Sequence, residues 1–512
     1  MTFDPKIIHL PEPTLTFGHR QMLEHPKDGL FLFGPLEEKK PRELRVGAIG
    51  TIEGLGRFRL WLTQIQNYIP PYDPVKPFHS SFPGFEAAFR TSWPTEPVAE
   101  ISLSGDKINR ALRLSDRHDA VYQAVDLFAD KLFSYHRQQE AQPTFWFVVI
   151  PEEVFRYGRP QIRPPRSEQV PSAFPFSARE ARKILIEGSL FPADRQAAEI
   201  YRFEVNFHNQ LKARLLEEKI VVQIVRETTL TPGDFVVNGK PARRVEDPAT
   251  IAWNLCTTAL FKAGGKPWKI ANVRPGVCYV GLAFKRDSSA VGPSGSANAC
   301  CGAQMFLDSG DGLVFRGHLG PWYSEKTGDF HLSYDEAKGL ISSVISSYEA
   351  PGSERQNAAP AEIFIHGRTR FSDDEWAGFQ AAAPAGCKLV GVRIRGSNDV
   401  KLFRPGRHPV IRGTALILTE RLGYLWTNGF VPRLGTYTGW EVPRPLSIEI
   451  CRGEADLALV TADIMGLTKV NFNSCIFADG FPVTLRFADA VGEILTAAPI
   501  PNLPPLPFRH YI

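Results

Sequence analysis

The chain has 512 residues, of which 43% are hydrophobic and 22% are charged, and its formal net charge is +4. This composition is typical of a globular protein and excludes a chain that is disordered throughout. The apolar runs are far shorter than the ~18 residues of a membrane span, and the N-terminus lacks the basic and apolar regions of a secretory signal. The seven cysteines form no CxxC pair, so the sequence predicts reduced thiols in a cytoplasmic protein, with no zinc site or disulfide framework.

The first half of the chain predicts a parallel α/β domain. The segment 1–40 contains several prolines and is expected to be an irregular linker. Strand and helix patterns then alternate, as in a Rossmann-like unit. The predicted strands are 44–49, 144–150 and 220–225, the predicted helices are 55–68, 116–136 and 197–217, and 160–175 is a proline-rich loop. These elements define a first domain over 41–245.

The second half predicts a different α/β order. A helix over 250–263 ends at Gly264-Gly265, which is a typical helix stop. The predicted strands are 277–284, 303–307, 312–317, 361–366 and 388–394, the predicted helices are 334–348 and 373–382, and the predicted loops are 288–297 and 351–360. The order βββαβα is that of an RNase-H-like core, and it defines a second domain over 246–512.

One glycine-rich segment, 47–56, has part of the spacing of a dinucleotide-binding motif. Arg59 stands where the third glycine should be, and no strand ending in an acidic residue follows at the expected distance. The pattern therefore favours a simple strand-to-helix turn over a nucleotide site.

Four polar residues form a candidate anion pocket. His208 and Lys212 are four residues apart and share one helix face, Gln223 lies on the next strand, and Lys262 precedes Gly264-Gly265. Each residue alone is typical of a solvated surface. Together, two cations, an imidazole and an amide could bind a phosphate.

Several motifs resemble those of Argonautes. The run 250–268, with a helix, a lysine, Gly-Gly and Pro-Trp, is similar to the start of an Argonaute PIWI domain. The segments 467–473, 481–485 and 487–489 match the C-terminal block of the family in order. With no room for N and PAZ domains, the resemblance is to short prokaryotic Argonautes, which have a MID and a PIWI domain. Residues 298–308, 320–322 and 507–512 are most similar to the Argonaute subunit of SPARTA systems.

The resemblance implies a function and a set of site residues. His208, Lys212, Gln223 and Lys262 fall on the positions that bind the 5′-phosphate of the guide in the MID domain. The apolar tail 506–512 is expected to dock rather than fray, so that the terminal carboxylate of Ile512 helps hold an Mg²⁺ ion that bridges the guide phosphate. The implied partners are a 5′-phosphorylated guide RNA, a single-stranded DNA target and an APAZ-containing effector subunit in a heterodimer. The effector could be TIR-APAZ, Sir2-APAZ or nuclease-APAZ, and TIR or Sir2 would deplete NAD⁺ in defence against plasmids or phage.

The resemblance also predicts that the chain does not cut its target. Cleavage requires several carboxylates around two Mg²⁺ ions. The family positions correspond here to Ala283, Arg368 and Asp489, and no helix glutamate can be assigned. The acidic groups Asp308/Asp311 and 373–375 are explained as a hairpin turn and a helix start. Two alternatives stay open at this point: an active RNase-H-like nuclease with displaced carboxylates, and an unrelated α/β protein with a chance pattern.

Overall fold

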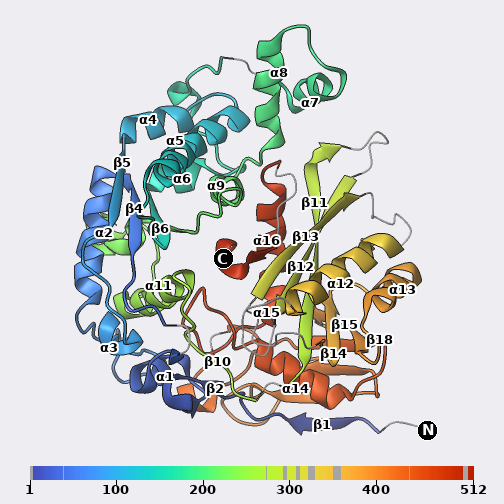
Figure 1. Ribbon diagram of the computed structural model, residues 1–512. Helices are drawn as coiled ribbons and strands as arrows, with labels where there is room; N and C mark the ends of the chain where they lie inside the picture. Colours follow the sequence, from blue (N-terminus) through green and yellow to red (C-terminus); the bar gives the residue numbers. More distant parts are fainter. Residues whose placement is uncertain are drawn as a thin grey trace.

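The computed structural model describes residues 4–499 and 505–512, apart from 38–39, 174–175, 273, 292–296, 307–311, 321–328, 350–358 and 438. Two large sheets organise these residues: a four-stranded parallel sheet on one side of the molecule and a ten-stranded mixed sheet on the other (Figure 1). Two small sheets complete the β-structure of the described part. None of its helices is both long enough and apolar enough to cross a membrane.

The parallel sheet has the strand order β5-β4-β6-β7. Its strands are β4 (Val46–Thr51), β5 (Ala99–Leu103), β6 (Phe145–Ile150) and β7 (Val222–Arg226). Strands β4 and β6 are buried along their whole length, which explains why their sequences are apolar without alternation. Side chains of α2 (Ile52–Ile65) join one core cluster, whereas those of α5 (Arg117–Gln138) join another with β6. The predicted Rossmann-like domain is confirmed.

The predicted long helix over 197–217 is wrong. The chain forms α8 (Pro192–Glu199) and a short 3-10 turn, then begins again with α9 (Phe207–Leu215). The break lies at Asn206, whose side-chain oxygen accepts a hydrogen bond from the backbone N–H of Asn209 at 3.3 Å. Asparagine favours such a cap over a helix interior.

The glycine-rich segment forms the predicted strand-to-helix turn between β4 and α2. The Thr51 hydroxyl caps α2 by accepting a hydrogen bond from the N–H of Gly54 at 3.1 Å. A Cβ atom at Gly50 would lie 2.7 Å from the carbonyl oxygen of Val149. Close packing of β4 on β6 therefore accounts for this glycine.

The ten-stranded sheet has the order β1-β16-β17-β18-β15-β14-β11-β12-β13-β19. Its central part is β11 (Val277–Val291), β12 (Ala297–Phe306), β13 (Gly312–Gly320), α12 (Tyr334–Glu349), β14 (Glu362–Gly367), α13 (Asp373–Ala382) and β15 (Lys388–Gly396). Strands β11 to β13 are antiparallel, and β14 runs parallel to both β11 and β15. The predicted RNase-H-like order is confirmed.

The loops predicted in this half are only partly correct. Strand β11 continues to Val291 and β12 begins at Ala297, so the prediction of a loop over 288–297 is wrong for the strand residues. Residues 292–296, the Asp308–Asp311 turn and most of the loop 351–360 lie outside the described residues. The acidic start of α13 is confirmed, because Ser372 and Glu375 form a reciprocal capping box there.

The segment 1–40 is not an irregular linker. Strand β1 (Lys6–His9) pairs antiparallel with β16 (Thr414–Ile417) at one edge of the ten-stranded sheet. The segment also contains β2 (Leu15–Thr16), β3 (Met22–Leu23) and α1 (Pro26–Phe33), and β2 pairs with β10 (Lys269–Ile270). The Glu12 carboxylate accepts a hydrogen bond from Arg412 and lies 2.9 Å from the Lys469 ammonium. These contacts join the segment to the second half of the chain.

The remaining elements cover the two sheets or connect them. They are α3 (Phe85–Phe89), α4 (Gly105–Leu112), α6 (Glu152–Tyr157), α7 (Ala178–Glu187), α10 (Glu227–Leu230), β8 (Val236–Val237), β9 (Lys240–Pro241), α11 (Pro248–Lys262), β17 (Leu422–Leu425), β18 (Leu446–Arg452), α14 (Leu457–Leu467), α15 (Val483–Arg486), α16 (Ala488–Thr496) and β19 (Leu506–Pro507). Helices α7 and α8 project together from the body at the top of Figure 1.

Candidate functional site

The C-terminal tail lies in the middle of the molecule, between the two large sheets (Figure 1). Strand β19 pairs with β13, and a 3-10 turn over Phe508–His510 follows it. Tyr511 and Ile512 are only 2% and 5% exposed. The prediction that the apolar tail docks is confirmed, and the last residues reach the polar cluster described next.

Two buried lysines meet this tail. The Lys212 ammonium, on α9, donates a hydrogen bond to the carbonyl oxygen of Tyr511 at 3.1 Å. The Lys262 ammonium, at the end of α11, donates to the carbonyl oxygen of Val222 at 2.7 Å and to the backbone oxygen of Ile512. Lys262 is fully buried and Lys212 almost so. Among the described residues, neither forms an ion pair with an aspartate or glutamate side chain.

Burial dominates the electrostatics of these lysines. Burial lowers the pKa of Lys212 to about 7. Burial, followed by the nearby charge of Lys212, lowers the pKa of Lys262 well below its ordinary value. A buried ammonium group is costly unless an anion compensates it. The arrangement therefore favours binding of an anion at this place.

His208 belongs to the same cluster, and Gln223 borders it. Burial, then the charge of Lys212, lowers the pKa of His208 to about 3, so its imidazole is neutral at pH 7. Its Nδ1 atom lies 3.1 Å from the side-chain oxygen of Asn209; this oxygen only accepts, so Nδ1 carries the proton. Gln223 follows Val222 on β7, and its buried Oε1 atom has no hydrogen-bond partner in the described part. The structure thus brings together His208, Lys212, Lys262 and Ile512.

A pocket of about 750 Å³ opens beside His208, between the ends of β6 and β7 and helix α16. The Phe155 ring lies in its wall between two guanidinium groups, those of Arg159 and Arg226, at 3.7 and 3.6 Å from the ring centre. Arg226 is held by Glu152 at 3.1 Å. Arg243, also in the wall, donates a hydrogen bond to Thr228 at 2.8 Å.

These three arginines were not predicted from the sequence. Arg226 ends a strand, and carboxyl ends of parallel strands commonly line sites, which is the one signal that could have indicated it. The pocket wall carries these arginines together with Glu204 and Glu493, and His208 connects it to the lysine cluster. Its size suits a nucleotide.

A second set of predicted residues lies at the carboxyl end of β14 and at the neighbouring positions of β11. Gly281 and His366 are paired in register on these parallel strands, and Ala283 and Arg368 each follow two residues later. The Arg368 guanidinium forms an ion pair with the Asp489 carboxylate of α16 at 3.0 Å. A Cβ atom at Gly281 would lie 1.9 Å from the carbonyl oxygen of Thr484, so the glycine permits α15 to pack on β11. The structure thus joins Arg368 and Asp489 and places Ala283 at the same level of the sheet.

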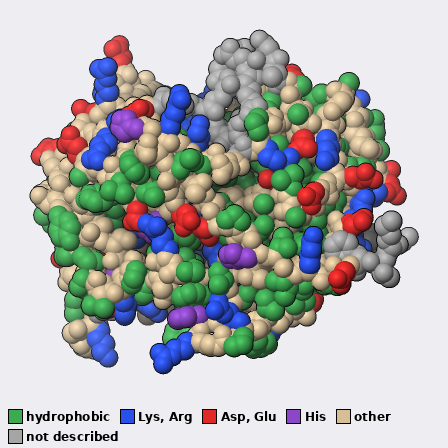
Figure 2. Space-filling view, turned by 90° about the horizontal axis from the view of Figure 1, so that it is seen from below, with side chains coloured by type: hydrophobic (Ala, Val, Ile, Leu, Met, Phe, Trp, Pro, Cys, Tyr) green, Lys and Arg blue, Asp and Glu red, His purple; other side chains and the backbone are tan. Residues whose placement is uncertain are grey.

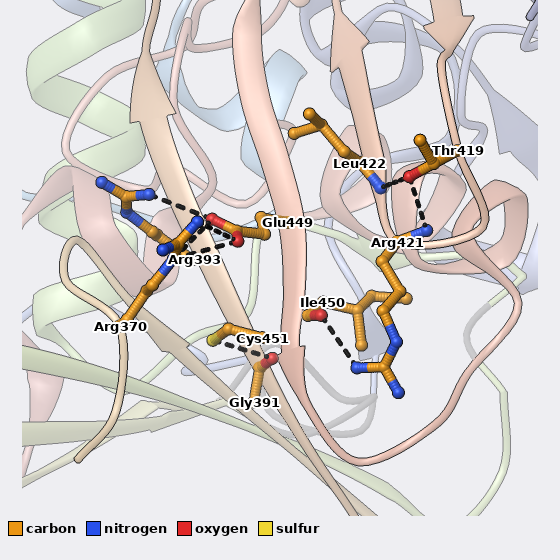
Figure 3. A network of polar contacts seen from close by, with 9 residues as sticks. All are labelled: Arg370, Gly391, Arg393, Thr419, Arg421, Leu422, Glu449, Ile450 and Cys451. Atoms are coloured by element: carbon orange, nitrogen blue, oxygen red, sulfur yellow. Dashed lines mark hydrogen bonds and ion pairs between the residues drawn. The ribbon is translucent and has the colours of Figure 1, made fainter.

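The loop that carries Arg368 is fixed by a charged network (Figure 3). Glu449 on β18 accepts hydrogen bonds from Arg370 at 3.0 and 2.7 Å and from Arg393 at 3.0 Å. Across the described residues, no group of three or more His, Cys, Asp or Glu side chains is arranged to hold a metal ion.

Helix α16 connects the two sets of residues. Its Glu493 forms an ion pair with Lys285 of β11 at 3.0 Å and lies 3.4 Å from the side-chain nitrogen of Asn209, the neighbour of His208. The same helix carries Asp489. The pocket and the Arg368–Asp489 pair therefore share one structural element.

Comparison with solved structures identifies this arrangement. The chain is similar to Clostridium butyricum Argonaute bound to a guide DNA and a 19-mer target DNA, with a TM-score of 0.62 and 15% identity over 97% of this chain and 53% of that chain. The fold is that of the MID and PIWI domains of Argonautes. It is also similar to Aa-Ago with externally bound siRNA, with a TM-score of 0.55 and 16% identity over 98% of this chain and 56% of that chain.

A further similar structure, A. aeolicus Argonaute, gives a TM-score of 0.53 at 14% identity over 97% of this chain and 53% of that chain. The chain spans about half the length of the Argonautes it matches. No protein-family model and no curated protein matches its sequence. The lysine cluster joins the two halves of the chain, because Lys212 belongs to the first half and Lys262 and the tail to the second.

One face of the molecule carries charged side chains of both signs. Seen from below, basic and acidic side chains are interspersed with apolar ones (Figure 2). This face therefore carries no continuous positive surface.

Proposed function

We propose that this protein is a short Argonaute that holds a 5′-phosphorylated guide RNA and uses it to recognise single-stranded DNA. The observation that carries the proposal is the pair of buried lysines, Lys212 and Lys262, whose hydrogen-bond partners among the described residues are main-chain oxygens, with no aspartate or glutamate beside them. A phosphate dianion is the ligand that would compensate two buried ammonium groups through short, charge-assisted hydrogen bonds. Gln223 adds a neutral donor through its side-chain nitrogen, the neutral imidazole of His208 lines the adjoining pocket, and the pocket with Phe155 takes the first nucleotide. Sequence is then read by base pairing between guide and target.

The oxygen atoms of this site suit an Mg²⁺ ion. Oε1 of Gln223 is buried and has no hydrogen-bond partner among the residues that the structure describes, and the backbone oxygen of Ile512 faces the cluster. Where Ile512 ends the chain, this oxygen belongs to a carboxylate. Mg²⁺ prefers oxygen ligands and keeps several waters, so few protein ligands suffice. The cation would reduce the repulsion between the carboxylate and the guide phosphate.

We further propose that the protein binds its target without cutting it. Two-metal cleavage needs several carboxylates at one place. Here Ala283 cannot bind a metal ion, Arg368 carries a positive charge, and Asp489 is already engaged by Arg368. These features support a degenerate cleavage centre. Cleavage of a labelled target by the purified protein with guide and Mg²⁺ or Mn²⁺ would contradict it and favour a nuclease with displaced carboxylates.

The effect on the cell would then come from a partner in the cytoplasm. The resemblance of 298–308 and 507–512 to SPARTA sequences favours a TIR-APAZ subunit whose NADase activity responds to target binding, with Sir2-APAZ and nuclease-APAZ as the other choices. The projecting α7–α8 hairpin exposes Ile186, Leu190 and Phe191 by 67%, 96% and 67%. Exposed apolar side chains at one place are typical of an interface.

Nucleic acid that copurifies with the protein tests the proposal. We expect RNA whose 5′ ends accept label from a polynucleotide kinase only after phosphatase treatment. The variant Lys212→Met/Lys262→Met should yield much less of it. Copurified strands with free 5′-hydroxyl ends, or equal amounts of RNA in both proteins, would contradict the proposal.

A further inference from the structure

The loop after β15 lies outside the guide pocket and carries several exposed positive charges. Residues Lys401 to His408 are exposed except for Leu402, and they include Lys401, Arg404 and Arg407. No aspartate or glutamate occurs between Asp399 and Glu420. In the described part of the chain, none of these three cations makes an ion pair or a side-chain hydrogen bond. The loop is therefore a local concentration of uncompensated positive charge.

Aromatic side chains accompany these cations. Phe403, within the loop, is 73% exposed. Trp440, in the loop between β17 and β18, is completely exposed. Both loops lie at the same edge of the sheet, because Gly396 and Leu446 are paired and the N–H of Ser397 donates to the carbonyl oxygen of Pro445 at 2.9 Å. Large rings in water lose the stabilisation that burial gives them, so this edge favours a ligand with flat apolar surfaces.

The base of the loop is well packed, and this packing fixes the position of its exposed tip. Val400 and Leu402 pack against a small separate core made by Val410, Tyr424 and Trp426. The His408 ring stacks on Phe430, with the ring centres 4.0 Å apart and the planes at 15°. This anchoring reduces the entropy that the tip would lose on binding a ligand.

The position of the loop links it to the proposed nucleic-acid path. His366 is paired with Val392 of β15, so Arg368 lies level with Ile394, and the loop begins just after β15 ends at Gly396. Strands β14 and β15 are parallel neighbours, so their carboxyl ends lie at one edge of the sheet. The loop is thus on the edge that carries the Arg368–Asp489 pair.

We infer that the loop 401–408, on the same sheet edge as the loop that carries Trp440, is a second contact surface for single-stranded nucleic acid, separate from the guide pocket. Lys401, Arg404 and Arg407 bind backbone phosphates, and Phe403 stacks on a base. Cations interleaved with exposed aromatic rings suit such strands because every base has a flat face and every nucleotide carries a charge. This inference rests on the proposed guide-binding function, since it extends the path of a strand beyond its 5′ end.

Salt-dependent binding tests the inference with two probes. The first is a 5′-phosphorylated single strand of 19 nucleotides, the target length in the C. butyricum complex. The second is a 5′-phosphorylated dinucleotide, which is confined to the pocket. In the variant Lys401→Ala/Arg404→Ala/Arg407→Ala, the slope of log K against log salt for the long strand should decrease in magnitude by about 2, at ~0.7 for each phosphate contact. Phe403→Ala should weaken long-strand binding about 5- to 150-fold without changing the slope.

A charge-matched control separates the loop from general electrostatics. Arg179→Ala/Arg182→Ala/Lys183→Ala removes three exposed charges from α7 and should leave the slope unchanged. Dinucleotide binding should be unchanged in all three variants. An unaltered slope in the loop variant, with preference for a 5′-phosphate intact, would overturn this inference alone. Absence of that preference in the unmodified protein would instead contradict the proposed function, and the slope would still decide whether the loop binds strands.

Discussion

Replacement of Lys212 by methionine should strengthen the fold and weaken guide binding. Methionine keeps much of the volume of the lysine chain but removes a charge that burial opposes. Burial lowers the pKa of Lys212 from 10.5 to about 7, and each pKa unit corresponds to about 1.4 kcal/mol. The free energy of unfolding should therefore increase, by at most about 5 kcal/mol, less the ~1 kcal/mol lost with the hydrogen bond to Tyr511.

The same substitution removes one charge-assisted bond to the guide phosphate. Such bonds contribute about 1.5–3 kcal/mol, which corresponds to a loss of about 10- to 150-fold in affinity. Fluorescence anisotropy with a 5′-phosphorylated strand measures the affinity, and urea unfolding at pH 7 measures the stability. The control Lys131→Met, at an exposed position of α5, should change neither quantity. A variant that is less stable and binds the phosphorylated strand as before would refute the reasoning.

Four further predictions follow from the same contacts. Preference for a 5′-phosphate should decline as the pH rises above about 7, because Lys212 is then neutral in the free protein and must take up a proton to bind the phosphate; a preference that is constant from pH 7 to pH 9 would be inconsistent with this. The unfolding free energy of the free protein should increase over the same pH range, since the unfolded chain then binds more protons than the folded one, and Lys212→Met should flatten this increase in urea titrations. A C-terminal extension of three glycines should weaken guide binding and remove its response to EDTA, whereas unchanged binding would mean that Ile512 contributes only packing. Ala283→Asp should not produce target cleavage in a gel assay, because the Asp489 carboxylate still forms an ion pair with Arg368. Cleavage by that variant would show that the centre lacked only one carboxylate.

Elements with strong local patterns were predictable from the sequence. Strand β6 reads Phe-Trp-Phe-Val-Val-Ile, and the structure buries all six residues. The RNase-H-like order was also predictable, because each of its strands is bounded by turn or helix signals. The apolar residues of the tail indicated that it packs against the body of the protein, and the burial of Tyr511 and Ile512 confirms this.

Elements that depend on distant partners were not predictable. Strand β1 has only four residues and gains its hydrogen bonds from β16, about 400 residues later in the chain, so no local pattern marks it. The break before α9 depends on the cap at Asn206, which the helical periodicity on both sides concealed. Both errors arose where a tertiary contact or a single side chain outweighed the local pattern.

The candidate site was likewise predictable only in part. Helical spacing placed His208 and Lys212 on one face, and their chemistry allowed Lys262 to be grouped with them as a candidate anion pocket, but Ile512 joined them only through the resemblance to Argonautes. The actual partners of the lysines are backbone oxygens of Val222, Tyr511 and Ile512, which have no sequence signature. The pair of guanidinium groups around Phe155 likewise arises from two segments that only the fold brings together.

The central claim is that the cluster of Lys212 and Lys262 binds the 5′-phosphate of a guide. The most direct measurement compares the affinity of the unmodified protein for two RNA strands of identical sequence, one with a 5′-phosphate and one with a 5′-hydroxyl, in Mg²⁺ at pH 7. With at least one charge-assisted bond at stake, the phosphorylated strand should bind at least about tenfold more tightly. Equal affinities for the two strands would contradict the account.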